Sequence, residues 1–201
     1  MKLYVSAIPP NPRKVILYVK EKGLDIPQVE IDIMKGEQKT PEFLAKNPFG
    51  ALPVLQLDDG SYLTESLAIM EYLEELHPEN PMLGTNAQAR ARVRELERIA
   101  DTGVLNAVAA VFQNTSPFFA KSVRQSPDVA EAGRARFTRN LAVLDAKIGD
   151  NAFVAGDKPT FADCTLFAAL AFGEFAGVEA APESKNVLRW FAAFKQRPSA
   201  S

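Results

Sequence analysis

The secondary-structure pattern expected from the sequence changes once, between residues 78 and 85, and this change restricts the fold more than any other feature. Up to about residue 78, short strand-like runs alternate with helical runs. Beyond the segment Pro-Glu-Asn-Pro-Met-Leu-Gly-Thr, which has the composition of a linker, every periodic run is helical. We therefore expect two domains, a small helix-covered sheet over residues 1–78 and an all-helical domain over residues 86–201.

The first half predicts the order strand, helix, strand, helix, strand, strand, helix. Its expected strands are 2–6, 28–33, 54–57 and 61–63, and its expected helices are 11 or 12 to 23, 41–46 and 64–76. In the second half, helices are expected near 86–113, 127–149, 160–176 and 184–196. The run Thr160-Phe161-Ala162-Asp163 has the pattern of a capping box, with Asp in place of Glu, and it marks the start of the third of these.

The composition is that of an ordinary globular protein, with 47% hydrophobic and 24% charged residues and a net charge of −2. That charge gives no electrostatic reason to expect nucleic acid or an anionic membrane as a partner. The single cysteine, Cys164, excludes an intrachain disulfide and the usual zinc patterns, so we expect no metal. Prolines interrupt the apolar N-terminus, and no run approaches the ~20 apolar residues of a membrane span. The cytoplasm is the expected compartment.

Two short segments carry the chemistry. Leu52-Pro53 stands just before a strand, where a proline often forms a turn; if its peptide bond is cis, the peptide groups of Leu52 point outward and can pair with an extended peptide. Glu65-Ser66 falls at a helix N-terminus, where free N–H groups and the Ser66 hydroxyl can bind a carboxylate and Glu65 an ammonium. Taken singly, these are a turn and a cap. Taken together, they predict a clamp for glutathione, which has paired amides and a free amino-acid end.

Over essentially its whole length the chain resembles the cytosolic glutathione transferases. The resemblance is carried by Lys2-Leu3-Tyr4, Arg13-Lys14-Val15, Asn47-Pro48-Phe49-Gly50, Leu52-Pro53-Val54-Leu55, Glu65-Ser66-Leu67-Ala68-Ile69 and Phe161-Ala162-Asp163-Cys164-Thr165. It implies an α/β thioredoxin-like N-terminal domain, an all-α C-terminal domain, a homodimer and glutathione as co-substrate. It also implies that Leu52, at the Pro53 turn, pairs with the cysteinyl unit and that Glu65 and Ser66 hold the γ-glutamyl group. Lys39 stands where many members place a basic residue against the glycyl carboxylate, although a solvated loop lysine is the alternative.

The chain departs from this family where most members activate the glutathione thiol. The position of their usual Tyr, Ser or Cys is taken by Pro9, which has no hydroxyl or thiol to offer. Ser6 is expected to be buried or to form a turn. Asn11 is a natural N-cap before Pro12, but its amide could also donate to a thiolate, so we keep it as a catalytic candidate.

The start of the chain resembles an atypical fungal and bacterial subgroup that also lacks the usual residue. In that subgroup, a water held by Ser and His of the helical domain is thought to assist. Here Ser116 or Asn114 could hold such a water, whereas the alternative for Ser116 is a cap before Pro117. The only histidine, His77, ends a helix and is expected to interact with its last carbonyls, which excludes a histidine base.

The expected function is conjugation of the glutathione thiolate to a small hydrophobic electrophile held by the second domain. Phe112, Phe118 and Phe119 are candidate apolar walls, with core packing as the alternative, and Phe49 is a candidate interface anchor. The alternatives are a glutathione-binding protein without transferase activity, which Pro9 favours, and a glutathione-dependent peroxidase or dehalogenase. A Ser-Ser-Cys run before the first helix is absent, which argues against maleylacetoacetate-type isomerisation.

Overall fold

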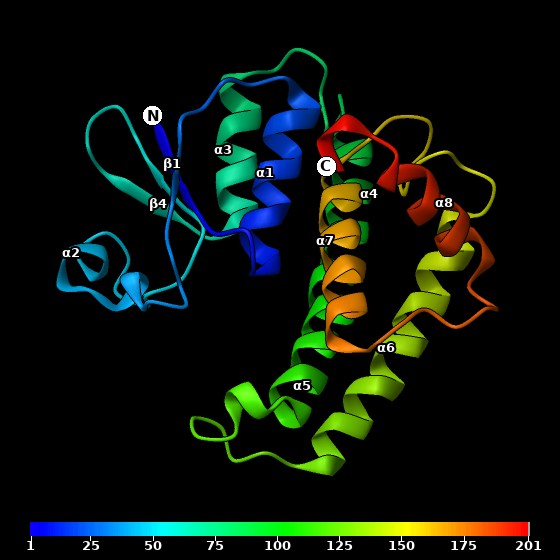
Figure 1. Ribbon diagram of the computed structural model, residues 1–201. Coiled ribbons are helices and arrows are strands. Elements are labelled where there is room, and N and C mark those ends of the chain that lie inside the picture. The colour runs from blue at the N-terminus through cyan, green and yellow to red at the C-terminus, as the bar shows by residue number, and fades with distance from the viewer. Residues whose placement is uncertain (201) are drawn as a thin grey trace. The chain divides into compact units, whose positions relative to one another are not determined.

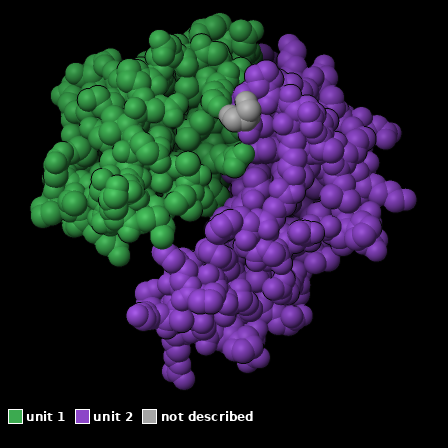
Figure 2. Space-filling model, viewed as in Figure 1, with its two compact units in different colours: residues 1–82 green, residues 83–201 purple. Residues whose placement is uncertain are grey.

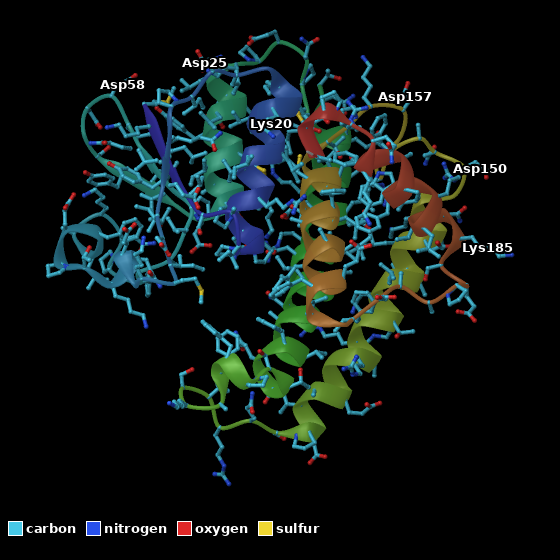
Figure 3. All side chains as sticks on the ribbon, in the orientation of Figure 1. Lys20, Asp25, Asp58, Asp150, Asp157 and Lys185 are labelled. Carbon is cyan, nitrogen blue, oxygen red and sulfur yellow. The ribbon has the colours of Figure 1, made fainter. Side chains whose placement is uncertain are left out.

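A computed structural model describes residues 1–200, and the chain forms two compact units (Figures 1 and 2). Unit 1 comprises residues 1–82, and unit 2 begins at Leu83. Charged side chains such as Lys20, Asp25 and Asp157 project outward from the ribbon and are exposed (Figure 3). Among the described residues, no helix combines the length and the apolar character that crossing a membrane requires.

Unit 1 is built on a four-stranded sheet in the order β2-β1-β3-β4. The strands are β1 (Lys2–Val5), β2 (Gln28–Glu30), β3 (Val54–Gln56) and β4 (Tyr62–Thr64). β1 runs parallel to β2 and antiparallel to β3, and β4 is antiparallel to β3. β2 is shorter than the predicted 28–33, because the chain turns at Asp32, whose carboxylate accepts the N–H groups of Met34 and Lys35.

Helices cover both faces of this sheet. α1 (Pro10–Lys22) and α3 (Ser66–Leu76) lie side by side (Figure 1), and η1 (Glu37–Lys39) and α2 (Pro41–Leu44) belong to the other layer. On the α2 layer, Phe43 packs in one core cluster with Tyr4 and Val54. Because side chains alternate along a strand, Leu3 and Leu55 point to the opposite face, and both are fully buried. The thioredoxin-like α/β fold expected for the first half is confirmed.

The first helix begins earlier than predicted. α1 starts at Pro10, its N-cap is Pro9, and no side chain caps it. The interpretation of Asn11 as the N-cap is therefore wrong. Proline has the backbone φ that the first helical position needs, and Pro9 adopts the extended conformation of an N-cap. The helix ends at Gly23, which takes the left-handed conformation of a C-cap.

A buried ion pair fixes α1 against α3. Lys22 Nζ lies 2.9 Å from Glu74 Oε2, and the Tyr18 hydroxyl donates to the same oxygen over 2.8 Å. The other carboxylate oxygen of Glu74 accepts the N–H of Met82 at 2.6 Å. This network therefore ties the last residues of unit 1 to its helical layer.

The regular elements described in unit 2 are all helices, as predicted. Its elements are α4 (Ala87–Arg98), η2 (Ile99–Leu105), α5 (Asn106–Thr115), η3 (Pro117–Phe119), α6 (Pro127–Ile148), α7 (Phe161–Ala176), α8 (Lys185–Lys195) and η4 (Pro198–Ala200). The predicted helix 86–113 contains a π-helical segment, η2, that the sequence pattern did not indicate. α7 is the central helix, and most of its residues are buried. The capping box of Thr160 and Asp163 at its start is confirmed.

Candidate functional site

A small pocket of about 60 Å³ in unit 1 gathers residues from four separate places in the chain. They come from the start of α1, the segment after α2, the turn before β3 and the start of α3. The lining residues are Asn11, Asn47, Ala51, Leu52, Pro53, Glu65 and Ser66. Five residues predicted from the sequence thus meet at one place, namely Asn11, Leu52, Pro53, Glu65 and Ser66.

One wall of the pocket is the turn before β3. The Leu52–Pro53 peptide bond is cis, and β3 begins only at Val54. Leu52 is 9% exposed, and neither its N–H nor its C=O has a hydrogen-bond partner within residues 1–200. Unpaired main-chain groups at a nearly buried residue are uncommon, because each one loses its contact with water. An extended peptide that pairs with Leu52 would satisfy both groups.

Another part of the pocket lining is the start of α3. Its N-cap, Glu65, has φ 71° and ψ 119° and makes no side-chain cap bond. The N–H groups of Ser66, Leu67 and Ala68 have no partner among the described residues, and the first bond of the helix runs from Ile69 N to Glu65 O. A positive φ outside glycine costs on the order of 1 kcal/mol and often marks a functional site.

Ser66 adds a side-chain donor to these main-chain groups. It is 8% exposed, and its hydroxyl has no partner in the described part of the chain. Three free N–H groups, the positive end of the helix dipole and this hydroxyl form a site for an anion. The carboxylate of Glu65 is exposed at the rim of the same pocket, where it could bind a cation.

The start of α1 offers few donors. Pro10 and Pro12 have no N–H group. The N–H of Asn11, between them, and its side-chain amide have no partners within residues 1–200. Ser6 is 2% exposed and is not among the pocket's lining residues, in agreement with its prediction as a buried residue. Asn11 is therefore the residue of the first turn that presents polar groups to the pocket.

Sequence reasoning missed two lining residues, Asn47 and Ala51. The Asn47 side chain donates to Ala51 O at 2.8 Å and accepts the N–H of Phe49 at 3.1 Å. An Asn-Pro pair directly after a predicted helix was the available signal, because asparagine in such a position often bonds the main chain of the following turn.

Lys39 does not line the pocket. It is exposed at the end of η1, and no described residue binds its ammonium group. Its neighbour Gln38 has a shielded Oε1 without a hydrogen-bond partner in the described chain, and its Nε2 lies 3.4 Å from Ile33 O. A Cβ on Gly50 would lie 2.9 Å from Gln38 O, so η1 touches the segment that carries Asn47 and Ala51.

Ser116 and Asn114 belong to unit 2, and both have local structural partners. The Ser116 hydroxyl caps η3 by accepting the N–H of Phe118 at 3.3 Å, as the alternative interpretation expected. Asn114 uses both ends of its amide, donating to Ala110 O and accepting from Ser126 N. His77 does bond a helix carbonyl, since its main-chain N–H donates to Leu73 O at 3.0 Å, while its side-chain Nδ1 lies 3.6 Å from Glu79 Oε1.

Unit 2 also carries an exposed aromatic cluster, which we call the phenylalanine cluster. The predicted Phe112, Phe118 and Phe119 are joined in it by Phe172 and Phe175 of α7, with ring centroids 5.0–6.3 Å apart. Phe118 is 64% exposed and Phe175 68% exposed, so these two rings are not core residues. An exposed apolar cluster of this size in a globular unit commonly marks a binding surface.

Both units match known protein families. A family model described as "Glutathione S-transferase, N-terminal domain" matches residues 3–81, and one described as "Glutathione S-transferase, C-terminal domain" matches residues 107–198. Glutathione S-transferase 2 of Saccharomyces cerevisiae is 30% identical over 99% of this chain and 87% of the yeast protein. Maleylacetoacetate isomerase of Pseudomonas aeruginosa is 31% identical over 89% of this chain and 84% of the isomerase.

A solved structure is also similar over the complete length. It is a glutathione S-transferase domain-containing protein of Marinobacter aquaeolei, with a TM-score of 0.91 and 34% identity, and the match covers 100% of both chains.

Proposed function

The chain belongs to the glutathione S-transferase family and is a transferase enzyme, and from this premise we propose that it conjugates the thiolate of glutathione to a small hydrophobic electrophile. The observation that carries the proposal is the pocket of unit 1, which is lined both by a main-chain edge and by a helix N-terminus with a hydroxyl, all without partners among the described residues. This combination suits a ligand with both a peptide backbone and a free amino-acid end, and glutathione has both.

In this proposal, residues 1–78 form the glutathione-binding domain. Leu52, held by the Pro53 turn, pairs its N–H and C=O with the cysteinyl unit. Ser66 and the free N–H groups of α3 bind the γ-glutamyl carboxylate, and Glu65 binds the ammonium group. Lys39 is proposed to reach the glycyl carboxylate from η1, since its ammonium group has no other partner in the described chain.

We propose that Asn11 stabilises the thiolate, because Pro9 stands where most family members have a Tyr, Ser or Cys. Lowering a thiol pKa from ~8.5 to ~7 requires about 2 kcal/mol. A hydrogen bond to a charged acceptor contributes about 1.5–3 kcal/mol, so one or two donors from Asn11 suffice. Ser116 is the second catalytic candidate, through a water, because a hydroxyl that accepts a cap bond can still donate its own proton.

The electrophile is proposed to bind to the helical domain, residues 86–201, at the phenylalanine cluster. Five aromatic rings, with four edge-to-face pairs and one stacked pair, provide a surface for an apolar molecule. We further propose that the protein is a cytoplasmic homodimer that acts in detoxification. No metal, nucleic acid or membrane has a part in this mechanism.

Retention on immobilised glutathione, followed by titration of the bound thiol by its ultraviolet absorbance, tests the proposal. We expect retention and a thiol pKa below that of free glutathione. Retention with an unshifted thiol pKa would instead support the binding protein without transferase activity, which Pro9 favours. If the protein is not retained at all, the proposed glutathione site is refuted. A lowered pKa without conjugation of an aromatic electrophile would favour a peroxidase or dehalogenase, which use the same thiolate.

A further inference from the structure

Asn47 is tied to the main chain around it by every polar group it has. It is 3% exposed, and its side-chain Nδ2 donates to Ala51 O at 2.8 Å while Oδ1 accepts Phe49 N at 3.1 Å. Its own N–H donates to Phe43 O at 3.0 Å, and its C=O accepts Gly50 N at 2.9 Å. Asn47 therefore joins the end of α2 to the whole of the segment 48–51.

The residue that follows this segment is Leu52, whose main-chain groups are left unpaired for a ligand. The bond from Asn47 to Ala51 O is consequently the last hydrogen bond on the described main chain before the edge that receives the peptide. Past Leu52, the chain is next fixed where β3 pairs with β1, at Val54. The orientation of the Leu52 peptide groups therefore depends on how the chain is held at Ala51 on one side and at Val54 on the other.

The packing of Gly50 shows that the segment has little room to move in one direction. Gly50 has a φ of 59°, and a Cβ there would lie 2.9 Å from the main-chain oxygen of Gln38. η1 thus limits the segment on one side, and the Asn47 side chain holds it through its bonds to residues 49 and 51. The pocket itself includes Asn47 and Ala51 among its lining residues.

We propose that Asn47 is a positioning residue for glutathione: its amide, by holding Ala51, sets the main-chain edge of Leu52 in the orientation that pairs with the cysteinyl unit. This inference rests on the proposed glutathione site and adds a residue that acts through the main chain rather than by touching sulfur. An amide is required because one end must donate to Ala51 O and the other must accept from Phe49 N.

The first test is Asn47→Ala, with the dissociation constant and the KM for glutathione measured together with kcat. The bond is present without the ligand, so its loss weakens affinity only as far as glutathione must reorder the segment, at most by the bond's own ~1–1.5 kcal/mol or about tenfold. We expect KM for glutathione to rise by up to that factor, with kcat changed less than about twofold. An unchanged dissociation constant in a folded variant would overturn the proposal.

The second test, Asn47→Asp, separates positioning from a general structural role. An ionised carboxylate can accept from Phe49 N but repels Ala51 O, whereas a protonated carboxyl donates to Ala51 O as the amide does. The ratio of the variant's dissociation constant to the wild-type value should therefore fall as the pH is lowered from about 7.5 to about 5. The same ratio for Asn47→Ala should stay constant, and parallel behaviour of the two variants would contradict the proposal.

The matched control is Asn186→Ala, which removes an asparagine in unit 2 whose Nδ2 also donates to a main-chain oxygen, Asp145 O at 3.1 Å. This control should leave glutathione affinity unchanged, and an equal loss of affinity in both variants would identify a general effect of removing an asparagine.

If the variants at Asn47 do not fold, hydrogen exchange of the wild-type chain tests the proposal instead. Bound glutathione should slow exchange at Phe49 and Gly50, and unchanged exchange there would overturn the inference. Failure of the wild-type chain to bind glutathione would instead refute the proposed function.

Discussion

At the scale of single residues, Ser66 offers two kinds of donor to one anion, its hydroxyl and the free N–H of its main chain. Ser66→Ala removes only the hydroxyl. Because a hydrogen bond to a charged group contributes about 1.5–3 kcal/mol, we expect glutathione to bind at least about tenfold more weakly, measured by titration calorimetry. Ser61→Ala is the control, since the Ser61 hydroxyl bonds Asp59 in the turn between β3 and β4. Equal affinity in wild type and Ser66→Ala would refute our placement of the γ-glutamyl carboxylate.

Asn11 can be tested through the acidity of the bound thiol. Asn11→Ala removes the side-chain donor but keeps the main-chain N–H, so the pKa of bound glutathione should rise by about one unit. Asn11→Asp should raise the thiol pKa further, because a carboxylate close to the sulfur disfavours the thiolate. Absorbance titration of the bound thiol measures both. If neither variant moves the pKa, stabilisation of the thiolate comes from the main chain or from water.

The gathering of Leu52, Pro53, Glu65 and Ser66 around one pocket could be anticipated, because each stands at a turn or a helix start with its own local signal. Asn11 was expected as the cap, and the local pattern could not show that Pro9 would take this position instead. Asn47 and Ala51 were missed because their role depends on a contact across a folded loop. Ser116 illustrates the opposite case, since a Ser before a Pro predicted its cap directly.

At the scale of elements, the start of α7 depends on one buried carboxylate. Asp163 accepts four hydrogen bonds, from the N–H and hydroxyl of Thr160 at 2.8 Å each and from Val154 N and Trp190 Nε1 at 2.9 Å each. Burial raises its pKa from the ordinary 3.8 to about 6, and these hydrogen bonds oppose the shift. The native state therefore binds a proton more tightly than the unfolded chain.

Asp163 should therefore make the stability of the protein depend on pH. Folding takes up a proton between about pH 4 and pH 6, so the contribution of Asp163 is fully present below about pH 4 and is lost as the pH rises through about 6. Asp163→Asn removes this titration and loses an acceptor. We expect the variant to have a lower free energy of unfolding than wild type throughout this pH range. The difference in the free energy of unfolding should widen from pH 7 to pH 4 by at most about 3 kcal/mol. Urea unfolding, followed by the fluorescence of Trp190, measures this difference, and a difference that is constant or narrows would contradict the shift.

Element starts and types were predictable where the signal is local. The capping box placed the start of α7 to within one residue, whereas Val154 and Trp190, which complete its bonding, lie outside the box, 9 and 27 residues from Asp163. The π-helical segment η2 had no visible signal, because it lies inside an unbroken helical pattern. Its glycine at 103 lies where a Cβ would be 2.8 Å from the side chain of Asn140, a contact that depends on how α6 packs.

At the scale of the whole molecule, Phe49 is the most exposed of the large apolar side chains in the described chain, at 88%. Burial of such a ring against a second copy would contribute about 2–3 kcal/mol. If the protein is the homodimer that we propose, Phe49→Ala should raise the dimer dissociation constant by more than about tenfold, measured by sedimentation equilibrium. Phe118→Ala, which removes an exposed ring from unit 2, is the control. An unchanged dimer dissociation constant for Phe49→Ala would show that Phe49 is not part of the interface.

The division of the chain into a mixed half and a helical half was visible in the sequence, because each half has its own periodicity. The resemblance then identified the fold, since periodicity alone does not specify how four short strands pair. The phenylalanine cluster was found only in part, because Phe172 and Phe175 lie on α7, far along the chain from Phe112.

The unpaired main chain of Leu52 has a consequence for how such a site can change over time. Every amino acid except proline supplies the same N–H and C=O, so recognition at this position does not depend on the side chain. Residue 52 can therefore drift among apolar side chains that fill the same space while the ligand is still held. The selective constraint moves instead to the neighbours that orient the main chain. For an engineer, position 52 is a place to diversify, and positions 47 and 53 are places to leave alone.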